Sequence, residues 1–346
     1  MSHLFWSRVF SSNDVCSLPE FDRELLDREL HDREQFAQER LNEALAVLTE
    51  PFPSSLLPNG QDSACSIPLE VDVLRLDRLG SPNFRSTPLH VSGNKVFKLA
   101  GHIDAFFASS TSSLVSFGGR WSNHLHALAA VAQSLSIPSI GFVRGYPEQL
   151  LTATLQDCVD MGMTLKFCDK QTYAKRYDPD WRQALSEKYD AWVIPEGGEG
   201  EKGMVGFRAL APILKHYDHI WVAAGTGTSA QGIAAHLTAQ QTLVVVNAVA
   251  DQGELQRKWA AAMMSSVACQ WEIIDDAHQG GFGKCPPELR TLIASADAAG
   301  LPLDPVYTAK LVSAFLKRLT ESAGHSAVKT LLIHTGGLQG RRGYDL

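Results

Sequence analysis

The feature that most constrains this fold is a regular alternation between short aliphatic or β-branched runs and helical stretches. The runs are "SLVSF" (113–117), "SIGFV" (139–143), "TLKF" (164–167), "AWVIP" (191–195), "HIWVAAG" (219–225), "TLVVVNAV" (242–249) and "TLLIHTG" (330–336). Helix-forming segments lie between most of them, at 122–135, 147–161, 202–215, 229–239, 252–264, 285–298 and 308–321. Strands that alternate with helices build parallel sheets covered on both faces. The pattern therefore predicts an α/β protein whose ligands bind where strands lead into helices.

The first 66 residues follow another pattern and are predicted to form an N-terminal helical extension and linker. Three near-repeats, "DRELL DRELH DREQF", run from Asp22 to Phe36, and helix formers continue to about Glu50. One apolar stripe is formed by Leu26, Leu30, Ala37, Leu41, Leu45 and Leu48. We expect an amphipathic helix that packs on the body or on another subunit; its charge density leaves a solvated arm as the alternative. The segment "PFPSSLLPNGQDSACS" (51–66) has the composition of a linker.

Composition and charge argue against several classes of partner. The net charge of −7 disfavours nucleic acid and anionic membranes, and no apolar run approaches the roughly 20 residues that span a bilayer. The six cysteines contain no C-x-x-C pair, so we expect reduced thiols in a cytoplasmic protein rather than a zinc site or a disulfide framework. The N-terminus carries one arginine, Arg8, before it turns acidic, so no targeting peptide is expected.

A glycine-rich loop in "VAAGTGTSAQGIAA" predicts a phosphate site. Gly225, Thr226, Gly227, Thr228 and Ser229 place consecutive N–H donors and hydroxyls between a strand and a helix. The loop is not a Walker A loop, because no Gly-Lys-Ser/Thr follows. It does fit G-x-G-x-x-A, with Asp251 about 20 residues further on, so a dinucleotide site is an alternative, and a plain tight turn is another.

A second loop, "SFGGRWSNHLHALAA", follows the strand at 113–117. Gly118 and Gly119 allow close backbone approach to a ligand, and Ser122 can cap the next helix. An ordinary capped turn is the alternative. Asn123 and His124 favour a binding loop, because they are polar side chains at a helix start that could have used any residue.

A lysine stands at another helix start, in "VSGNKVFKLAGH", where Lys95 precedes Lys98 by three residues. "DPVYTAK" puts Tyr307 and Thr308 at a helix start, and Thr335 in "HTGGLQG" follows a strand. A phosphate cradle combined with a reactive lysine suits pyridoxal phosphate, which carries a phosphate and an aldehyde. A dinucleotide enzyme would leave the lysine and the Ser-Asn-His loop without a role.

Together these stretches resemble the pyridoxal-phosphate enzymes of the tryptophan synthase β fold (fold type II), and within them the 1-aminocyclopropane-1-carboxylate (ACC) deaminase and D-cysteine desulfhydrase family. The motifs "GNKVFKL", "SFGGRWSNH", "GTGTSAQG", "DPVYTAK" and "HTGG" occur in the family's order and spacing, from about residue 68 to the end. The resemblance implies a two-domain α/β fold with parallel or mixed sheets covered by helices. It further implies a large cofactor-binding domain at 67–104 and 211–346, a small domain at 105–210, the extension at 1–66, and a homodimer.

Carried over residue by residue, the resemblance makes Lys95 the Schiff-base lysine and the proton shuttle at the substrate α-carbon. Lys98 becomes a neighbouring surface or helix-packing residue. The implied cofactor contacts are Asn123 at the 3′-oxygen, Gly225, Thr226, Gly227 and Thr228 at the phosphate, Thr308 near the pyridine nitrogen, and Thr335. Ser122 contacts substrate or assists proton transfer, Tyr307 lines the substrate side of the ring, and Trp121, Asn123, His124 and Phe282 complete the substrate contacts. No metal is expected.

Three departures from the family pattern, at Phe97, Trp121 and Phe282, bear on the activity, as does Thr308, which matches the D-cysteine desulfhydrases. Phe97 stands where the family usually has arginine, and Trp121 belongs to "GRWSNH", where an aliphatic residue and a glutamine are common before the serine. Phe282 and Thr308 stand where ACC deaminases carry a tyrosine and a glutamate. A neutral threonine makes a weaker electron sink, so we expect β-elimination from a small, D-configured amino acid, as in D-cysteine desulfhydrases, with pyruvate and ammonia as products. ACC deamination to 2-oxobutyrate, a dinucleotide-dependent oxidoreductase and a cofactor-binding homologue without turnover are the alternatives.

Overall fold

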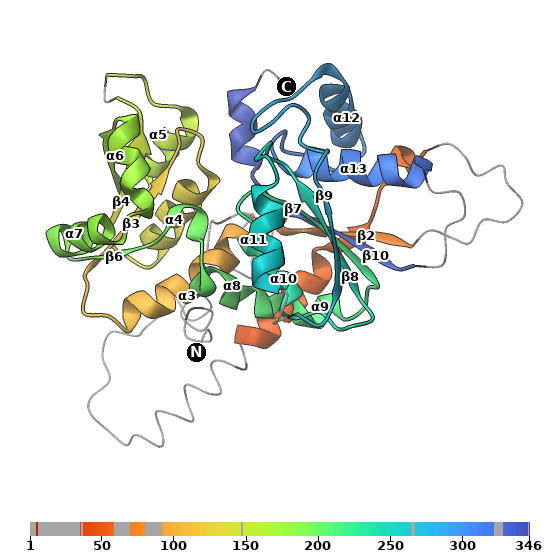
Figure 1. The fold of residues 1–346 in the computed structure, drawn as a ribbon, viewed down its shortest axis with the longest axis horizontal. Coiled ribbons are helices and arrows are strands. Elements are labelled where there is room, and N and C mark those ends of the chain that lie inside the picture. Colours follow the sequence, from red (N-terminus) through yellow and green to blue (C-terminus); the bar gives the residue numbers. More distant parts are fainter. Residues whose placement is uncertain are drawn as a thin grey trace, which may run out of the picture. The chain divides into compact units, whose positions relative to one another are not determined.

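The computed structural model describes residues 5, 35, 37–58, 70–79, 91, 93–146, 148–263, 267–321, 328–344 and 346. The chain divides into two compact units, whose elements are labelled in Figure 1. Unit 1 comprises Met1–Ala44 and Leu79–Ala209, and unit 2 comprises Leu45–Arg78 and Leu210–Leu346. Each unit contains one of the two sheets described below. None of the described helices is long and apolar enough to cross a membrane.

Unit 1 contains a four-stranded parallel sheet in the order β5-β4-β3-β6. Its strands are β3 (Ser113–Gly118), β4 (Ser139–Arg144), β5 (Met163–Cys168) and β6 (Ala191–Val193). Its helices are α3 (Lys95–Phe107), α4 (Asn123–Ser134), α5 (Ala153–Asp160), α6 (Lys170–Ala174), α7 (Pro179–Tyr189) and α8 (Glu201–Val205), with the 3-10 turns η3 (Lys175–Tyr177), η4 (Glu196–Gly198) and η5 (Gly206–Leu210), the last ending at the unit boundary.

The core of unit 1 explains why the sequence of β3 is mostly apolar. Every residue of β3 is buried. Val115 and Phe117 pack with Phe142, Tyr173 and Leu185 on one face, while Leu114 and Ser116 are buried on the other. Successive side chains of a strand point to opposite faces, so both faces of this sheet are covered.

Unit 2 contains a six-stranded sheet in the order β1-β2-β10-β7-β8-β9, parallel except for β1. Its strands are β1 (Thr49–Pro51), β2 (Val71–Arg75), β7 (His219–Ala224), β8 (Thr242–Asn247), β9 (Gln270–Ile274) and β10 (Thr330–His334). Its helices are α9 (Ala211–Leu214), α10 (Thr228–Ala234), α11 (Glu254–Met263), α12 (Pro287–Ala298) and α13 (Thr308–Glu321), with the 3-10 turns η1 (Ser54–Leu56), η2 (Leu76–Arg78) and η6 (Leu338–Gly343).

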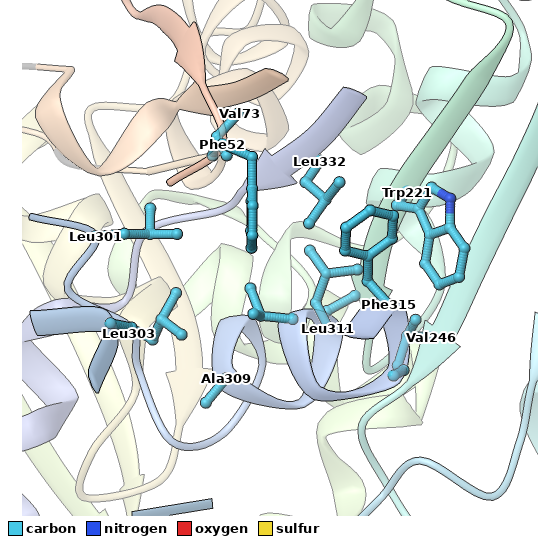
Figure 2. Packing of buried hydrophobic residues seen from close by; sticks show 14 of the residues in the cluster. Phe52, Val73, Trp221, Val246, Leu301, Leu303, Ala309, Leu311, Phe315 and Leu332 are labelled. Carbon is cyan, nitrogen blue, oxygen red and sulfur yellow. The ribbon is translucent and has the colours of Figure 1, made fainter. Parts of the chain in front are cut away.

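The core of unit 2 lies between one face of this sheet and α13 (Figure 2). Phe315 contributes edge-to-face contacts with Phe52 and Trp221, at ring-centroid distances of 5.7 and 5.3 Å. Val73, Val246 and Leu332 contribute from three strands of the sheet. The side chains between them along the strands, such as Val222, Val245 and Ile333, are also buried, so this sheet too is covered on both faces.

The α/β class predicted from the alternation is confirmed, and each of the seven predicted strands is present. The predicted helix at 202–215 is broken into α8, η5 and α9. A close backbone approach accompanies the break: a Cβ on Gly206 would lie 2.1 Å from the Phe97 carbonyl oxygen. Strands β1, β2 and β9 were not predicted, because they are short or carry polar side chains.

The N-terminal prediction is partly wrong. Residues 37–47 are helical, and the predicted stripe residues Ala37, Leu41, Leu45 and Leu48 are buried, but the helix does not continue to Glu50. Thr49–Pro51 forms β1 instead and pairs with β2. Phe52, which we assigned to a linker, lies in the core of unit 2. The near-repeats before Gln35, with Leu26 and Leu30, lie outside the described residues.

Unit 1 includes α3 together with most of the predicted small domain at 105–210. The domain boundaries predicted from the family resemblance stay a prediction.

Candidate functional site

Lys95 is the first residue of α3 and its amine is oriented by its neighbour. The Lys95 Nζ donates to the Asn94 side-chain oxygen over 3.0 Å, and Asn94 is buried. Gly93, just before, has a φ of 88°, a left-handed conformation that glycine adopts without strain. The "GNK" sequence is thus a turn that presents one lysine amine beside one fixed amide oxygen.

Lys98 lies one helical turn after Lys95 and is only 5% exposed, so it is a helix-packing residue and not a surface residue. Burial lowers the pKa of Lys98 well below its usual value, and the nearby charge of Lys95 lowers it further. Burial likewise lowers the pKa of His102, to about 4, and that of His124. Burial therefore disfavours the charged forms of these three side chains near Lys95, which the sequence did not reveal.

Ser122 caps α4, as predicted. Its Oγ accepts a hydrogen bond from the Leu125 N–H over 3.1 Å, which leaves the hydroxyl proton available for another partner. Asn123 begins the helix and is half-buried, and Trp121 is 41% exposed. A Cβ on Gly118 would lie 2.4 Å from the Ser122 Oγ, so the loop depends on glycine there.

His124 is held inside unit 1. Its Nε2 lies 2.8 Å from the Ser116 Oγ, and that hydroxyl donates to the Ile194 carbonyl over 2.8 Å. Because Ser116 has one proton and gives it to Ile194, Nε2 carries the hydrogen in this pair. The imidazole is thus buried and bonded to Ser116 through Nε2, and the substrate contact of His124 stays a prediction.

Phe97, where the resemblance led us to expect arginine, is fully buried against Phe207 at a ring-centroid distance of 5.7 Å. This position therefore makes an apolar contact within unit 1.

The predicted phosphate loop joins β7 to α10. The Thr226 and Thr228 hydroxyl oxygens lie 3.1 Å apart. Gly227 has a φ of 85°, and a Cβ there would lie 2.8 Å from Leu255 Cδ1 of α11. Thr335 follows β10, which pairs in parallel with β7, so Thr335 and this loop share one edge of the sheet.

Asp251, which the dinucleotide alternative requires, is already engaged. Its carboxylate accepts hydrogen bonds from the N–H groups of Gly253 and Leu255 and from the Asn247 side-chain amide. These contacts fix the start of α11 and leave little of the carboxylate for a ribose. This engagement of Asp251 counts against the dinucleotide alternative.

Tyr307 and Phe282 lie beside the phosphate loop. A Cβ on Gly225 would lie 3.2 Å from the Tyr307 hydroxyl oxygen, and the Phe282 and Tyr307 rings meet edge to face with centroids 6.4 Å apart. Phe282 is 63% exposed. Its loop is fastened by the fully buried Lys310, whose Nζ donates to the carbonyls of Gly281 and Ala248, each over 2.8 Å.

Thr308 begins α13 and is bonded to Asp304. The Thr308 Oγ lies 2.9 Å from the Asp304 Oδ1, and it accepts from the Asp304 N–H over 2.7 Å. Asp304 is almost fully buried. Asp304 was not among the predicted site residues, although an acidic residue followed by proline at a helix start is a recognisable capping signal.

These residues fit pyridoxal phosphate. Two adjacent hydroxyls and a glycine with positive φ stand in a loop between a strand and a helix start, which suits a phosphate, and the oriented Lys95 amine suits an aldehyde. The structure brings Lys95, Trp121, Ser122, Asn123 and His124 together in unit 1, and Gly225–Thr228, Phe282, Tyr307, Thr308 and Thr335 together in unit 2. Among the described residues, no cluster of three or more His, Cys, Asp or Glu side chains could hold a metal.

No protein-family model matches the chain. Among curated proteins it is similar to D-cysteine desulfhydrases from Salmonella schwarzengrund and Salmonella choleraesuis. With each it shares 27% identity over 282 residues, which cover 72% of this chain and 84% of the relative.

Solved structures with the same fold include an ACC deaminase homologue, with a TM-score of 0.64 and 24% identity over 87% of this chain and 96% of that chain. Another is an O-acetylserine-dependent cystathionine β-synthase from Helicobacter pylori, with a TM-score of 0.56 and 15% identity over 88% of this chain and 97% of that chain. A hydrogen sulfide-producing enzyme from Fusobacterium nucleatum matches with a TM-score of 0.53 and 14% identity, over 78% of this chain and 91% of that chain.

The resemblance predicted from the five motifs is confirmed: the chain has the tryptophan synthase β-like fold of the type II pyridoxal-phosphate enzymes, and its sequence is similar to that of D-cysteine desulfhydrases.

Proposed function

We propose that this chain is a pyridoxal-phosphate-dependent lyase, similar to D-cysteine desulfhydrase, that eliminates the β-substituent of a small D-amino acid. The observation that carries the proposal is the Lys95 amine held by Asn94 in a chain that also contains the Thr226–Thr228 phosphate loop and is similar to D-cysteine desulfhydrases. When bound, the cofactor supplies an aldehyde that binds amines covalently and a ring that withdraws electrons.

Lys95 and its neighbours would provide the covalent link and the proton transfer. Lys95 Nζ would link to the cofactor and take the proton from the substrate α-carbon. Its hydrogen bond to Asn94 fixes the direction of the amine. Burial disfavours the charged forms of Lys98 and His124, which reduces their repulsion against a protonated Lys95.

The other side chains would bind and orient. Gly225, Thr226, Gly227 and Thr228 would hold the phosphate with Thr335 at the same sheet edge, and Asn123 would bind the 3′-oxygen. The Ser122 hydroxyl keeps a proton to donate after capping α4, which suits contact with the substrate. Tyr307 and Phe282 would form an aromatic wall beside the ring. Trp121 is exposed and would contact the substrate from its loop.

The experiment that tests this function follows the visible absorption spectrum of the purified protein before and after addition of D-cysteine. A lysine-linked cofactor band that shifts on addition, with release of sulfide, pyruvate and ammonia, is the expected result. L-Cysteine and ACC serve as matched substrates. Formation of 2-oxobutyrate from ACC with no reaction of D-cysteine would replace the proposal with ACC deamination. A bound cofactor with no product from any of the three would indicate a homologue without turnover.

We also propose a cytoplasmic homodimer. The four described cysteines are unpaired, in keeping with a reducing compartment. Light scattering of the full chain should give about twice the mass of the 37.8 kDa monomer, and a monomer mass would contradict the dimer.

A further inference from the structure

Phe282 is an exposed aromatic residue on a loop with an unusual backbone. Positive φ angles, between 54° and 120°, occur at Gln279, Gly280, Gly281 and Gly283, and Phe282 is the exception among residues 279–283. Glycine adopts many conformations at little cost, so a loop of this composition would not by itself hold an aromatic ring in one place. Something outside the loop has to fix it.

Both peptide carbonyls that flank Phe282 accept a hydrogen bond from a side chain elsewhere in unit 2. The Lys310 Nζ donates to the Gly281 carbonyl over 2.8 Å, and the Tyr344 hydroxyl donates to the Gly283 carbonyl over 2.9 Å. Burial raises the pKa of Tyr344, so its hydroxyl keeps this proton at neutral pH. Phe282 is therefore held on both sides, although its own side chain is 63% exposed.

The Tyr344 side chain is itself attached to the body of unit 2. Tyr344 follows η6, and its N–H donates to the Arg341 carbonyl over 2.9 Å. The Arg341 guanidinium makes two hydrogen bonds to the Asp297 carboxylate at the end of α12, over 2.8 and 2.5 Å. The segment that begins with Thr335 at the sheet edge thus ends by fastening the loop of Phe282.

The exposed Phe282 ring lies beside residues assigned to the cofactor. It meets the Tyr307 ring edge to face, and the Tyr307 hydroxyl oxygen would lie 3.2 Å from a Cβ on Gly225 in the phosphate loop. Ligand sites are lined largely by aromatic and apolar side chains, and affinity is higher when these are fixed before the ligand binds. An exposed ring that is fastened at both neighbouring peptides has the properties of such a lining residue.

We propose that Tyr344 is a positioning residue of the candidate site, whose hydroxyl, together with Lys310, holds Phe282 where it contacts the substrate. The inference rests on the proposed function, which gives Phe282 that contact. In this role Tyr344 acts through Phe282 and needs no contact of its own with the substrate. Because the Lys310 bond remains, loss of the Tyr344 hydroxyl should loosen the loop without unfolding the protein.

The first test is hydrogen exchange of the full chain, measured by mass spectrometry on the peptide that contains residues 280–286. The Lys284 N–H closes the turn over Phe282 by donating to the Gly281 carbonyl over 3.1 Å, so its exchange reports opening of the loop. Tyr344→Phe removes only the hydroxyl. It should speed exchange in this peptide by about 3–10-fold, the equivalent of one neutral hydrogen bond.

The second test is a double-mutant cycle on the steady-state kinetics with D-cysteine. Tyr344→Phe should raise KM by about 3–10-fold and change kcat by less than about twofold, because it weakens the hold on a binding residue and leaves Lys95 in place. In a Phe282→Ala background, the same change should alter KM by less than about twofold. A general weakening of the structure would raise KM in both backgrounds.

Tyr217→Phe is the matched control for both measurements. It removes a hydroxyl that donates to Asp72 over 2.7 Å in the same unit. Tyr217 precedes β7 and Asp72 lies near the amino end of β2, so this bond lies at the opposite edge of the sheet from the phosphate loop. Tyr217→Phe should change neither the exchange of residues 280–286 nor KM.

Unchanged exchange of the loop in Tyr344→Phe would overturn the inference, as would a rise in KM that persists in the Phe282→Ala background. Equal effects of Tyr344→Phe and Tyr217→Phe would also overturn it. If the wild type forms no product from D-cysteine, the proposed function fails, and the substrate contact of Phe282 fails with it. The exchange measurement does not depend on turnover and decides separately whether Tyr344 holds the loop.

Discussion

At the residue scale, Gly118 is where the site loop tolerates least added volume. A Cβ at this position would lie 2.4 Å from the Ser122 Oγ and 2.8 Å from Leu125 Cδ1, the two residues that form the cap of α4. Gly118→Ala should therefore lower the free energy of unfolding by about 1–3 kcal/mol, through overpacking. Thermal or urea unfolding measures the change.

The neighbouring glycine provides the control. A Cβ on Gly119 has no heavy atom within 4 Å. Gly119→Ala should unfold within about 0.5 kcal/mol of the wild type. Equal losses in the two variants would show that the Ser122 cap is not what Gly118 protects.

Lys310 gives a pH-dependent prediction. Burial lowers its pKa to about 8, against 10.5 in the unfolded chain. Between these values the unfolded chain binds a proton that the folded chain does not, so Lys310 makes the free energy of unfolding rise with pH. The neutral amine keeps two N–H donors, enough for the Ala248 and Gly281 carbonyls.

Urea unfolding of the wild type and of Lys310→Met at a series of pH values from 7 to 10.5 isolates this contribution. The difference between the two should grow as pH rises above about 8. Lys310→Met should also be less stable throughout, because two buried carbonyls lose their donor. A difference that shrinks with increasing pH would contradict the assignment.

The roles of single residues were predictable where the partner is close in sequence. Ser122 was recognised as a cap because the helix it caps begins at the next residue. The burial of Lys98 and the contact of His124 with Ser116 were not predictable from sequence, because they depend on how helices pack on a sheet. The contacts of Asp304 were predictable in principle, since its partners lie within four residues. The prediction from this motif nevertheless included only Tyr307 and Thr308.

At the element scale, the apolar stripe of the N-terminal helix should contribute strongly to the free energy of unfolding. Leu41 is fully buried and Val47, on the same helix, is 71% exposed. Leu41→Ala should destabilise the protein by about 2–5 kcal/mol, the usual cost of truncating a buried leucine. Val47→Ala should change stability by less than about 0.5 kcal/mol.

Chemical unfolding of both variants checks this prediction. Equal and negligible effects would restore the alternative of a solvated arm, in which the stripe contributes nothing to folding.

Strands were predictable in proportion to their burial. β3, β7 and β8 are covered on both faces, and most of their residues are therefore apolar. β9, "QWEII", ends the sheet and carries exposed polar residues, so its sequence does not stand out. β1 has three residues and ends in proline, and only its pairing with β2 defines it as a strand.

At the scale of the whole molecule, the order of the motifs along the chain predicted the fold better than any single motif did. The phosphate loop alone was compatible with a dinucleotide; the other motifs and the contacts of Asp251 at the start of α11 count against that alternative. The division into two units was expected, but their limits depend on which segments pack together, and sequence spacing does not encode that.

The central claim is that Lys95, and no other lysine, bonds to pyridoxal phosphate. The most direct measurement is borohydride reduction of the cofactor-loaded protein, followed by proteolysis and mass spectrometry of the modified peptide. The account predicts modification of Lys95 alone, and its loss in Lys95→Ala but not when the exposed Lys317 is replaced by alanine. Label on the buried Lys98 or Lys310, or no label on any lysine, would contradict it.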